Sequence, residues 1–260
     1  MKITIFSSNQ SRHLNLVKQL SQIADTVYFI SETNTIFPGK VEDFFTRSEI
    51  MQKYFSKVLE SEKKIFGEIN FLPDNVKTVS IKMGDLNMMT KNQLEESLSS
   101  DLFIIFGASY IKGWLADFLV MKNAINIHMG ISPYYRGNSC NFWALYDNNP
   151  GYVGATIHLL TTGLDSGNMF FHCIPKIRLN DSPFDFTMRS VLVAHNGLCE
   201  SIKNKKLFNT VSEKQNKSLE IRYSKRIEFT DEVANEFLNR KFSFNEETIK
   251  YPKLLNPIFG

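Results

Sequence analysis

The residues Ala124-Ile125-Asn126-Ile127-His128-Met129 are typical of a short buried strand that carries two polar side chains. Successive side chains of a strand alternate between its faces, so Asn126 and His128 share one face while the two isoleucines point into the opposite layer. An amide and an imidazole cost free energy when they are buried without hydrogen-bond partners. The pair therefore indicates either a satisfied polar network in the core or a catalytic site at the carboxyl end of the strand.

The chain before this stretch predicts an α/β sheet. Strands are expected at residues 2–7, 26–30, 76–81 and 102–106. Helices are expected between them: one with an apolar face of Leu14, Val17, Leu20 and Ile23, a long one within 41–66, and one that a capping box starts at Thr90 and Gln93. This alternation favours a mostly parallel, twisted, Rossmann-like sheet, with the apolar run 102–106 at its centre.

The chain after this stretch predicts a helix at 138–146 and two strands at 154–161 and 168–177. The turn-rich residues 162–167 join these strands, so Asp165 is expected on a loop. Ser182-Pro183 has the cap and first-turn residues of a helix that runs to about residue 203. We therefore expect a main domain at 1–203. Residues 204–260 are expected to form a polar linker, a helix near 231–239 and a small carboxy-terminal appendage.

Composition excludes several classes of protein. A chain of 260 residues with 43% hydrophobic content and 22 Phe buries a sizeable core. Its net charge of +3, without a long basic block, gives no reason to expect a nucleic-acid partner. Three widely spaced cysteines argue against a disulfide scaffold and for a reducing compartment. The first apolar run is too short for a signal peptide, and none approaches the roughly 20 residues of a membrane span. We expect a cytoplasmic protein that does not enter the membrane.

The polar residues of the stretch suit chemistry at a carbonyl group. The amide of Asn126 and the imidazole of His128 are groups that stabilise the oxyanion formed when a nucleophile adds to a carbonyl. Asp165 is suited to orient His128 or a water molecule and to relay a proton. The sequence has no Gly-x-Ser-x-Gly elbow, and none of its cysteines lies in an activating context. Such a site suits direct transfer, in which the substrate supplies the nucleophile.

These residues carry a resemblance to a known family. Asn126-x-His128, then Ser132-Pro133 and Arg136-x-x-x-Cys140, then Gly163-Leu164-Asp165-Ser166-Gly167, resemble the signature of the formyltransferases that use N10-formyltetrahydrofolate. That family includes glycinamide ribonucleotide transformylase, methionyl-tRNA formyltransferase and the N-formyltransferases of nucleotide-linked amino sugars. The resemblance covers residues 2–203 in element order. It implies that Asn126, His128 and Asp165 form a catalytic trio and that a formyl group passes to a primary amine.

The resemblance also implies the binding residues. The pterin of N10-formyltetrahydrofolate is expected against two loops, through Phe106, Gly107, Ser109, Tyr110, Ile111, Thr161, Gly163 and Leu164. The acceptor, a small-molecule amine, is expected to contact Ser8, Asn9, Arg12, Tyr134, Tyr135, Arg136 and Gly137. No metal is expected, and a homodimer is left open.

Departures from the family pattern bear on the acceptor. Gly130-Ile131-Ser132-Pro133 stands where the family commonly has Ser-Leu-Leu-Pro, and residues 7–11 lack the glycines with which the ribonucleotide enzymes approach phosphate. Residues 204–260 are too few for the basic barrel of the tRNA enzymes. This favours a nucleotide-linked amino sugar of surface polysaccharide (lipopolysaccharide) biosynthesis. Glycinamide ribonucleotide and methionyl-tRNA are the alternative acceptors.

Other functions and roles stay open at this stage. A formyltetrahydrofolate hydrolase would share the trio but transfer the formyl group to water. Such a hydrolase usually carries a regulatory domain before the first strand, where we expect none. A non-catalytic nucleotide-binding domain would need no trio. His128 taken alone would also fit a hydrogen-bonded network in the core. His158 and His172 together would fit a zinc site. Three further sets each have a binding and a structural interpretation: the aromatic residues Tyr134, Tyr135 and Trp143, the single Arg136, and the basic Arg222, Lys225 and Arg226.

Overall fold

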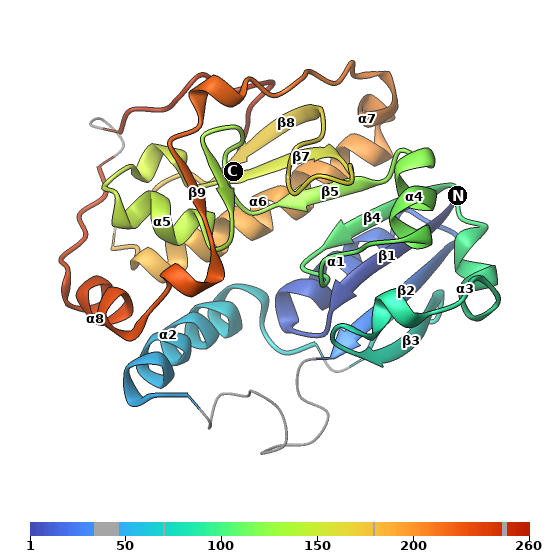
Figure 1. Cartoon of the computed structure of the whole chain (residues 1–260), viewed down its shortest axis with the longest axis horizontal. Coiled ribbons are helices and arrows are strands. Elements are labelled where there is room, and N and C mark those ends of the chain that lie inside the picture. Colours follow the sequence, from blue (N-terminus) through green and yellow to red (C-terminus); the bar gives the residue numbers. More distant parts are fainter. Residues whose placement is uncertain (34–46, 70, 179, 246–248) are drawn as a thin grey trace.

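The computed structural model describes residues 1–33, 47–69, 71–178, 180–245 and 249–260, and an eight-stranded sheet lies at its centre (Figure 1). The strands of the sheet are β1 (Lys2–Ser8), β2 (Thr26–Thr33), β3 (Val76–Lys82), β4 (Leu102–Phe106), β5 (Ile125–His128), β7 (Ala155–Leu159), β8 (Met169–Ile174) and β10 (Ile258–Phe259). A separate ribbon pairs β6 (Tyr135–Gly137) with β9 (Arg222–Ser224).

The order of the sheet is β10-β8-β7-β5-β4-β1-β2-β3. The five strands from β3 to β5 are parallel, whereas β7 runs antiparallel between β5 and β8. The parallel part needs helical crossovers, and β7 and β8 are joined by a loop of residues 160–168. The mostly parallel α/β sheet expected from the sequence is confirmed.

The helices are α1 (Ser11–Ser21), α2 (Glu49–Phe66), α3 (Lys91–Leu98), α4 (Trp114–Met121), α5 (Cys140–Tyr146), α6 (Pro183–Lys203), α7 (Lys206–Asn209) and α8 (Asp231–Asn239). Alternation along β4 divides the core between two layers. Ile104 packs in a cluster with α1 and α6, whereas Phe103 and Ile105 pack with α3 and α4. Both faces of the central strand are therefore covered, which explains its continuous apolar sequence.

The predicted elements agree closely with the observed ones. The capping box at Thr90 and Gln93 and the Ser182 cap are both present. The helix expected within 41–66 is observed as α2, which begins at Glu49, and residues 41–46 lie outside the described residues. Among the described residues, none of the helices has the length and apolarity to span a bilayer.

The residues expected to form a linker, a helix and an appendage contain the expected helix, α8, and contact the main domain at several points. Glu213 exchanges two backbone hydrogen bonds with Met169 of β8, β9 pairs with β6, and β10 extends the central sheet. Phe237 of α8 packs with Tyr54 of α2 and with α5 in a second aromatic cluster. A polar composition predicted a linker, but these few apolar and backbone contacts tie the segment down.

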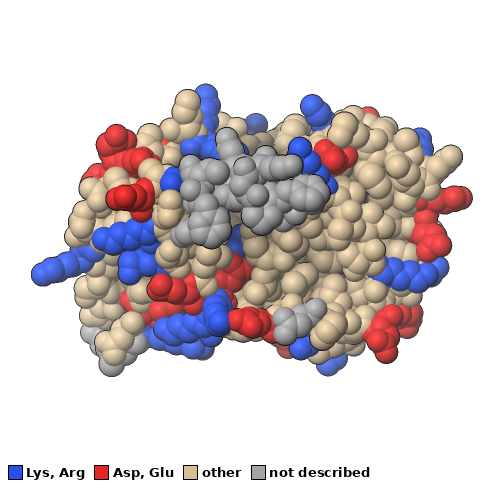
Figure 2. All heavy atoms as spheres, turned by 90° about the horizontal axis from the view of Figure 1, so that it is seen from below, with Lys and Arg blue, Asp and Glu red and all other residues tan. Residues whose placement is uncertain are grey.

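Charged side chains on the face seen in Figure 2 are mixed rather than sorted by sign. Lys and Arg lie among Asp and Glu on its described surface, and a large part of this face is uncharged. A broad basic field would attract a polyanion such as nucleic acid, and this face has none among its described residues.

Candidate active site

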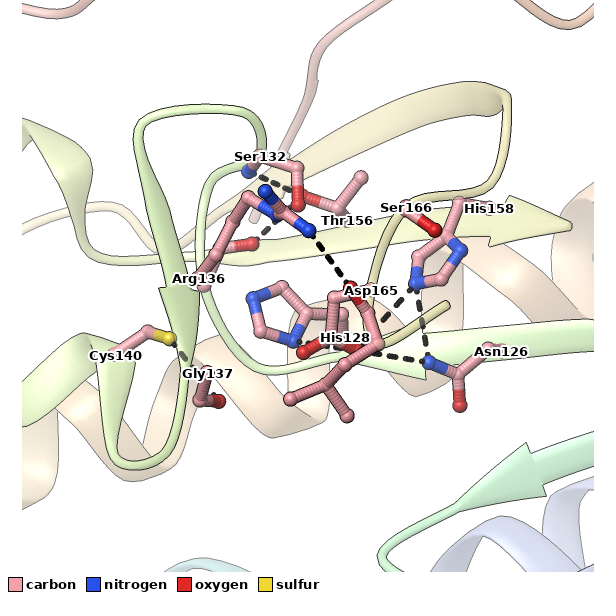
Figure 3. Close-up of polar contacts among 12 residues, drawn as sticks. Asn126, His128, Ser132, Arg136, Gly137, Cys140, Thr156, His158, Asp165 and Ser166 are labelled. Atoms are coloured by element: carbon pink, nitrogen blue, oxygen red, sulfur yellow. Dashed lines mark hydrogen bonds and ion pairs between the residues drawn. The ribbon is translucent and has the colours of Figure 1, made fainter. Parts of the chain in front are cut away.

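Strands β5 and β7 place four polar side chains on one face of the sheet. Asn126 and His128 share a face because they are two residues apart in β5. The antiparallel register sets His158 directly opposite Asn126 and Thr156 opposite His128. Figure 3 shows these side chains grouped beneath the loop that carries Asp165.

Asp165 lies at the centre of the group. Its Oδ1 is 3.3 Å from His128 Nδ1, 3.5 Å from Asn126 Nδ2 and 3.9 Å from His158 Nε2. The loop starts beside Ala124, at the amino end of β5, where Leu160 N donates to the carbonyl of Ala124. It then folds back over the face of the strand (Figure 3). The trio meets on this face, beside His128, which is the last residue of β5.

The hydrogen bonds assign the state of His158. Asn126 Nδ2 lies 3.0 Å from His158 Nε2, and His158 Nδ1 lies 2.7 Å from the carbonyl of Leu159. A carbonyl only accepts, so Nδ1 carries the proton and Nε2 accepts from Asn126. Both N–H groups of Asn126 then face internal partners, and its Oδ1 points away from the group (Figure 3).

Burial and charge set opposite protonation states for the two histidines. Burial opposes the charged form of His128, but the Asp165 carboxylate, joined by the Cys140 sulfur, raises the pKa of this imidazole well above its ordinary value. Burial, followed by the charge of His128, lowers the pKa of His158 to about 4. Burial would also raise the pKa of Asp165, but His128 outweighs it and holds this pKa at about 2. The site therefore combines a carboxylate, an imidazolium and a neutral imidazole.

The turn after β5 is fitted closely to His128. The carbonyl of Tyr135 lies 3.2 Å from His128 Nε2 and accepts a hydrogen bond from it. A Cβ on Gly130 would lie 2.7 Å from the same nitrogen and 2.6 Å from Cys140 Cβ, so only glycine fits there without a shift. Thr156 Oγ1 donates to the carbonyl of Gly130 and accepts from Ser132 N. Glycine at the first position of the Gly-Ile-Ser-Pro turn thus serves close packing.

With this geometry established, comparison with known proteins identifies the family. A model of the formyl transferase family matches residues 1–202, which is well over half of the chain. The chain belongs to the formyl transferase family. The family resemblance expected from the trio and its flanking motifs is therefore confirmed.

Individual relatives are distant. Methionyl-tRNA formyltransferase of Trichormus variabilis is 28% identical over 113 residues, 44% of this chain and 33% of that protein. The chain spans about a third of the length of the curated relatives that it matches first. Phosphoribosylglycinamide formyltransferase of Anaplasma phagocytophilum gives a TM-score of 0.53 at 16% identity, over 78% of this chain and 85% of that chain. An N-formyltransferase of Helicobacter canadensis, solved with folinic acid and dTDP-3-aminofucose, gives 0.53 at 18% identity, over 91% and 79%. These two structures show likeness of fold alone.

Two neighbouring loops hold the residues expected to bind the folate of a formyl transferase. Tyr110 Oη donates to the carbonyl of Thr162 at 2.9 Å and joins the loops, and Thr161 Oγ1 lies 2.9 Å from Ser166 Oγ. Tyr110 and Leu164 are exposed, whereas Phe106 and Ile111 are buried in the core. Gly107 has a φ of +65°, and a Cβ there would meet His13 Nε2 at 2.5 Å. Backbone groups and exposed apolar side chains, rather than Phe106 or Ile111, are available to a ligand.

Glu32 forms hydrogen bonds to the loop that contains Ser109. It is fully buried at the end of β2, and its carboxylate accepts from Ser109 N, Ser109 Oγ and Gly84 N, at 2.6, 2.7 and 2.9 Å. The expected ligand residue Ser109 therefore uses its polar groups internally. The sequence contains no sign of this role for Glu32, because an acidic residue next to an apolar strand is usually expected to be exposed to solvent.

The structure corrects the expectation for Tyr134 and Tyr135. Both rings are buried, and their hydroxyl groups bond the carbonyl of Lys253 and the carboxylate of Asp147. Neither ring offers a face to a base or a sugar. Aromatic residues beside a turn suit packing and stacking equally, and here they pack with Tyr152.

Basic residues expected near the acceptor are already paired. Arg136 forms an ion pair with Glu220 and donates to the carbonyl of Leu164, both at 2.8 Å. Arg12 pairs with the buried Glu62 at 2.7 Å. Arg222, one of the three basic residues left open by the sequence, lies 3.7 Å above the Trp143 ring and pairs with Asp147, so its guanidinium already has internal partners.

The remaining expected acceptor residues divide by exposure. Asn9 is exposed, whereas Ser8 is buried at the end of β1. Gly137 has a φ of +90°, and a Cβ there would lie 2.2 Å from the carbonyl of Ser224, so this glycine is explained by its close approach to β9. Of this set only Asn9 is open to a ligand without rearrangement.

The sequence leaves open a zinc site formed by His158 and His172. His172 instead lies between the carbonyl of Ser132 and the amide of Leu255, and no cluster of three or more potential metal ligands occurs among the described residues. The sequence does indicate that Thr156 and His158 lie on the same face of their strand, because they are two residues apart. Only the pairing of that strand with β5 places His158 beside Asn126. That pairing requires the register, which the sequence does not provide.

We predict that the protein loses stability as the pH falls from about 7 to about 5. Burial is the main cause that lowers the pKa of His13, His158, His172 and His195 below 6.5. In this range the unfolded chain therefore binds more protons than the folded chain, and the free energy of unfolding decreases. His128 opposes this trend only in the upper part of the range, because the stabilisation from its raised pKa is essentially complete once the pH is below 6.5. Calorimetry should show a Tm that decreases through this range, and a Tm that stays constant or rises would contradict the assignment.

Proposed function

We propose that the protein transfers a formyl group from N10-formyltetrahydrofolate to the primary amine of a small molecule. The observation that carries this proposal is the contact of one buried carboxylate, Asp165, with both His128 and Asn126, in a chain of the formyl transferase family. The relative solved with folinic acid supports a folate as the second substrate.

The residues around the trio fit a folate. Tyr110 and Leu164 are exposed apolar side chains on two loops that a hydrogen bond joins next to Asp165. Such a surface suits one face of a flat heterocycle, and the loop backbone supplies polar groups for its edge. N10-formyltetrahydrofolate would supply an activated formyl carbon at this position.

The chain's own residues then have defined roles in the transfer. The imidazolium of His128 places positive charge where a carbonyl oxygen becomes negative. Asp165 holds that charge and is suited to orient the amine, or a water molecule that carries its proton away. Asn126 can donate to the oxyanion once one of its internal bonds is exchanged, and its Oδ1 can accept from the amine. In the net reaction a bond forms between the amine and the formyl carbon, the bond from that carbon to the folate nitrogen breaks, and one proton moves between the two nitrogens.

The proposed acceptor is a nucleotide-linked amino sugar. The relative with a bound dTDP-linked amino sugar covers 91% of this chain, and the turn at residues 7–11 lacks glycine. Tyr223 is half exposed, and it lies across the β6–β9 ribbon from Arg136, whose guanidinium is 5.7 Å from its ring. We propose that this ring stacks on the base or the sugar of the acceptor, because Tyr134 and Tyr135 are buried. A product of this kind would serve surface polysaccharide synthesis.

We predict that Asn126→Ala lowers turnover by roughly 10² to 10³-fold with folding intact, because it removes a donor for the developing oxyanion. Asn149→Ala is the control, since Asn149 donates to Tyr135 Oη at 2.8 Å outside the trio. The measurement is the rate of tetrahydrofolate release at saturating acceptor. An Asn126→Ala protein with nearly full turnover and a normal Tm would remove Asn126 from the mechanism.

The acceptor is tested with a panel of amines. We expect dTDP- and UDP-linked amino sugars to be formylated with the highest kcat/KM, and the rate to rise with pH as the ammonium group of the acceptor loses its proton. Tetrahydrofolate release and the formylated product are measured together. Preference for glycinamide ribonucleotide or methionyl-tRNA would overturn the sugar assignment alone. Release of formate without any amine would indicate a hydrolase and overturn the transfer.

A further inference from the structure

The loop that carries Asp165 is held from outside by a segment far along the chain. Residues 213–224, here called the bracing segment, lie beyond residue 202, where the match to the family model ends. The segment starts at Glu213, which exchanges two backbone hydrogen bonds of 2.8 Å with Met169, and it ends in β9, which pairs with β6. Both of its ends are therefore fixed on strands of the main body.

Gln215 makes the direct contact. Its side chain is buried, and Nε2 donates to the carbonyl of Asp165 at 2.9 Å and to the carbonyl of Gly167 at 2.8 Å. Asp165 has a φ of +45°, a left-handed conformation that a residue with a side chain rarely adopts. One amide group thus fixes the backbone on both sides of Ser166 and holds the strained residue in place.

A second contact reaches the loop through Arg136. Glu220 pairs with Arg136 Nη1, and Arg136 Nη2 donates to the carbonyl of Leu164, the residue before Asp165. The Arg136 side chain is only 11% exposed, so Glu220 orients it in a partly desolvated place. Three carbonyl groups of the loop, those of residues 164, 165 and 167, therefore depend on the bracing segment.

We propose that Gln215, with Glu220 acting through Arg136, is a positioning residue that sets the distance of the Asp165 carboxylate from His128 and Asn126. This inference rests on the proposed function, because Asp165 matters for turnover only if the trio performs the transfer. Gln215 itself touches no reacting group in this arrangement. Carboxylate placement within a fraction of an ångström governs the rate, because misplacement by about 1 Å can cost 10²-fold.

The test compares Gln215→Met with Asn75→Leu. Asn75 is a matched control, because its Nδ2 also donates to two carbonyls, those of Ser21 and Ala24, at 2.9 and 3.0 Å, away from the site. We expect Gln215→Met to lower kcat by up to roughly 10²-fold with little change in KM for either substrate, and Asn75→Leu to leave both constants unchanged. Glu220→Gln should lower kcat by a smaller factor, and it keeps the test available if Gln215→Met folds poorly.

Two readouts separate positioning from general loss of structure. In an Asp165→Asn background, Gln215→Met should cause little further loss, because it acts only through that carboxylate. Hydrogen exchange of the amides of residues 161–167 should become faster in Gln215→Met and stay unchanged in Asn75→Leu. An equal loss in both backgrounds, or an unchanged exchange rate of the loop, would overturn the proposal. If the wild-type protein formylates no amine, the proposed function fails, and the exchange comparison still decides whether Gln215 holds the loop.

Discussion

The structure of the site depends on one buried ion pair, between the carboxylate of Asp165 and the imidazolium of His128. Each charge alone would cost several kcal/mol in so little solvent. At 3.3 Å the attraction between the two charges offsets the cost of burying them. The same attraction raises the pKa of His128 and lowers the pKa of Asp165. Asn126 and the neutral His158 complete the surroundings of the carboxylate. Loss of the carboxylate would leave a buried positive charge without a partner.

The fold supplies this pair from two directions. Strand β5 carries His128 and lies near the middle of the eight-stranded sheet, between β4 and β7. Asp165 comes on a loop in a backbone conformation that costs about 1 to 2 kcal/mol. The loop needs external support, and Gln215 and Arg136 provide it. A rigid cation and a supported anion suit a reaction in which charge develops briefly on a bound carbonyl.

The sequence predicts the structure best where local periodicity decides which face a side chain occupies. Alternation placed Asn126 and His128 on one face, and turn residues placed Asp165 on a loop. Prediction fails where long-range pairing decides. The place of His158 depends on the register of β7 against β5, and Gln215 acts on a residue 50 positions earlier in the chain. Tyr134 and Tyr135 were misjudged because an aromatic residue gives no local sign of whether its ring is buried. The residues after 203 packed onto the core through contacts that a polar composition concealed.

The ¹⁵N chemical shifts of the His128 imidazole, followed against pH, test the ion pair most directly. In the wild-type protein His128 should titrate well above 6.5, because the Asp165 carboxylate outweighs burial. In Asp165→Asn only burial and the remaining neighbours act, and the pKa of His128 should fall below its value in the wild-type protein. The same titration should leave His158 neutral in both proteins above pH 6. A wild-type His128 that titrates at or below 6.5, or one that titrates identically in the two proteins, would contradict the account.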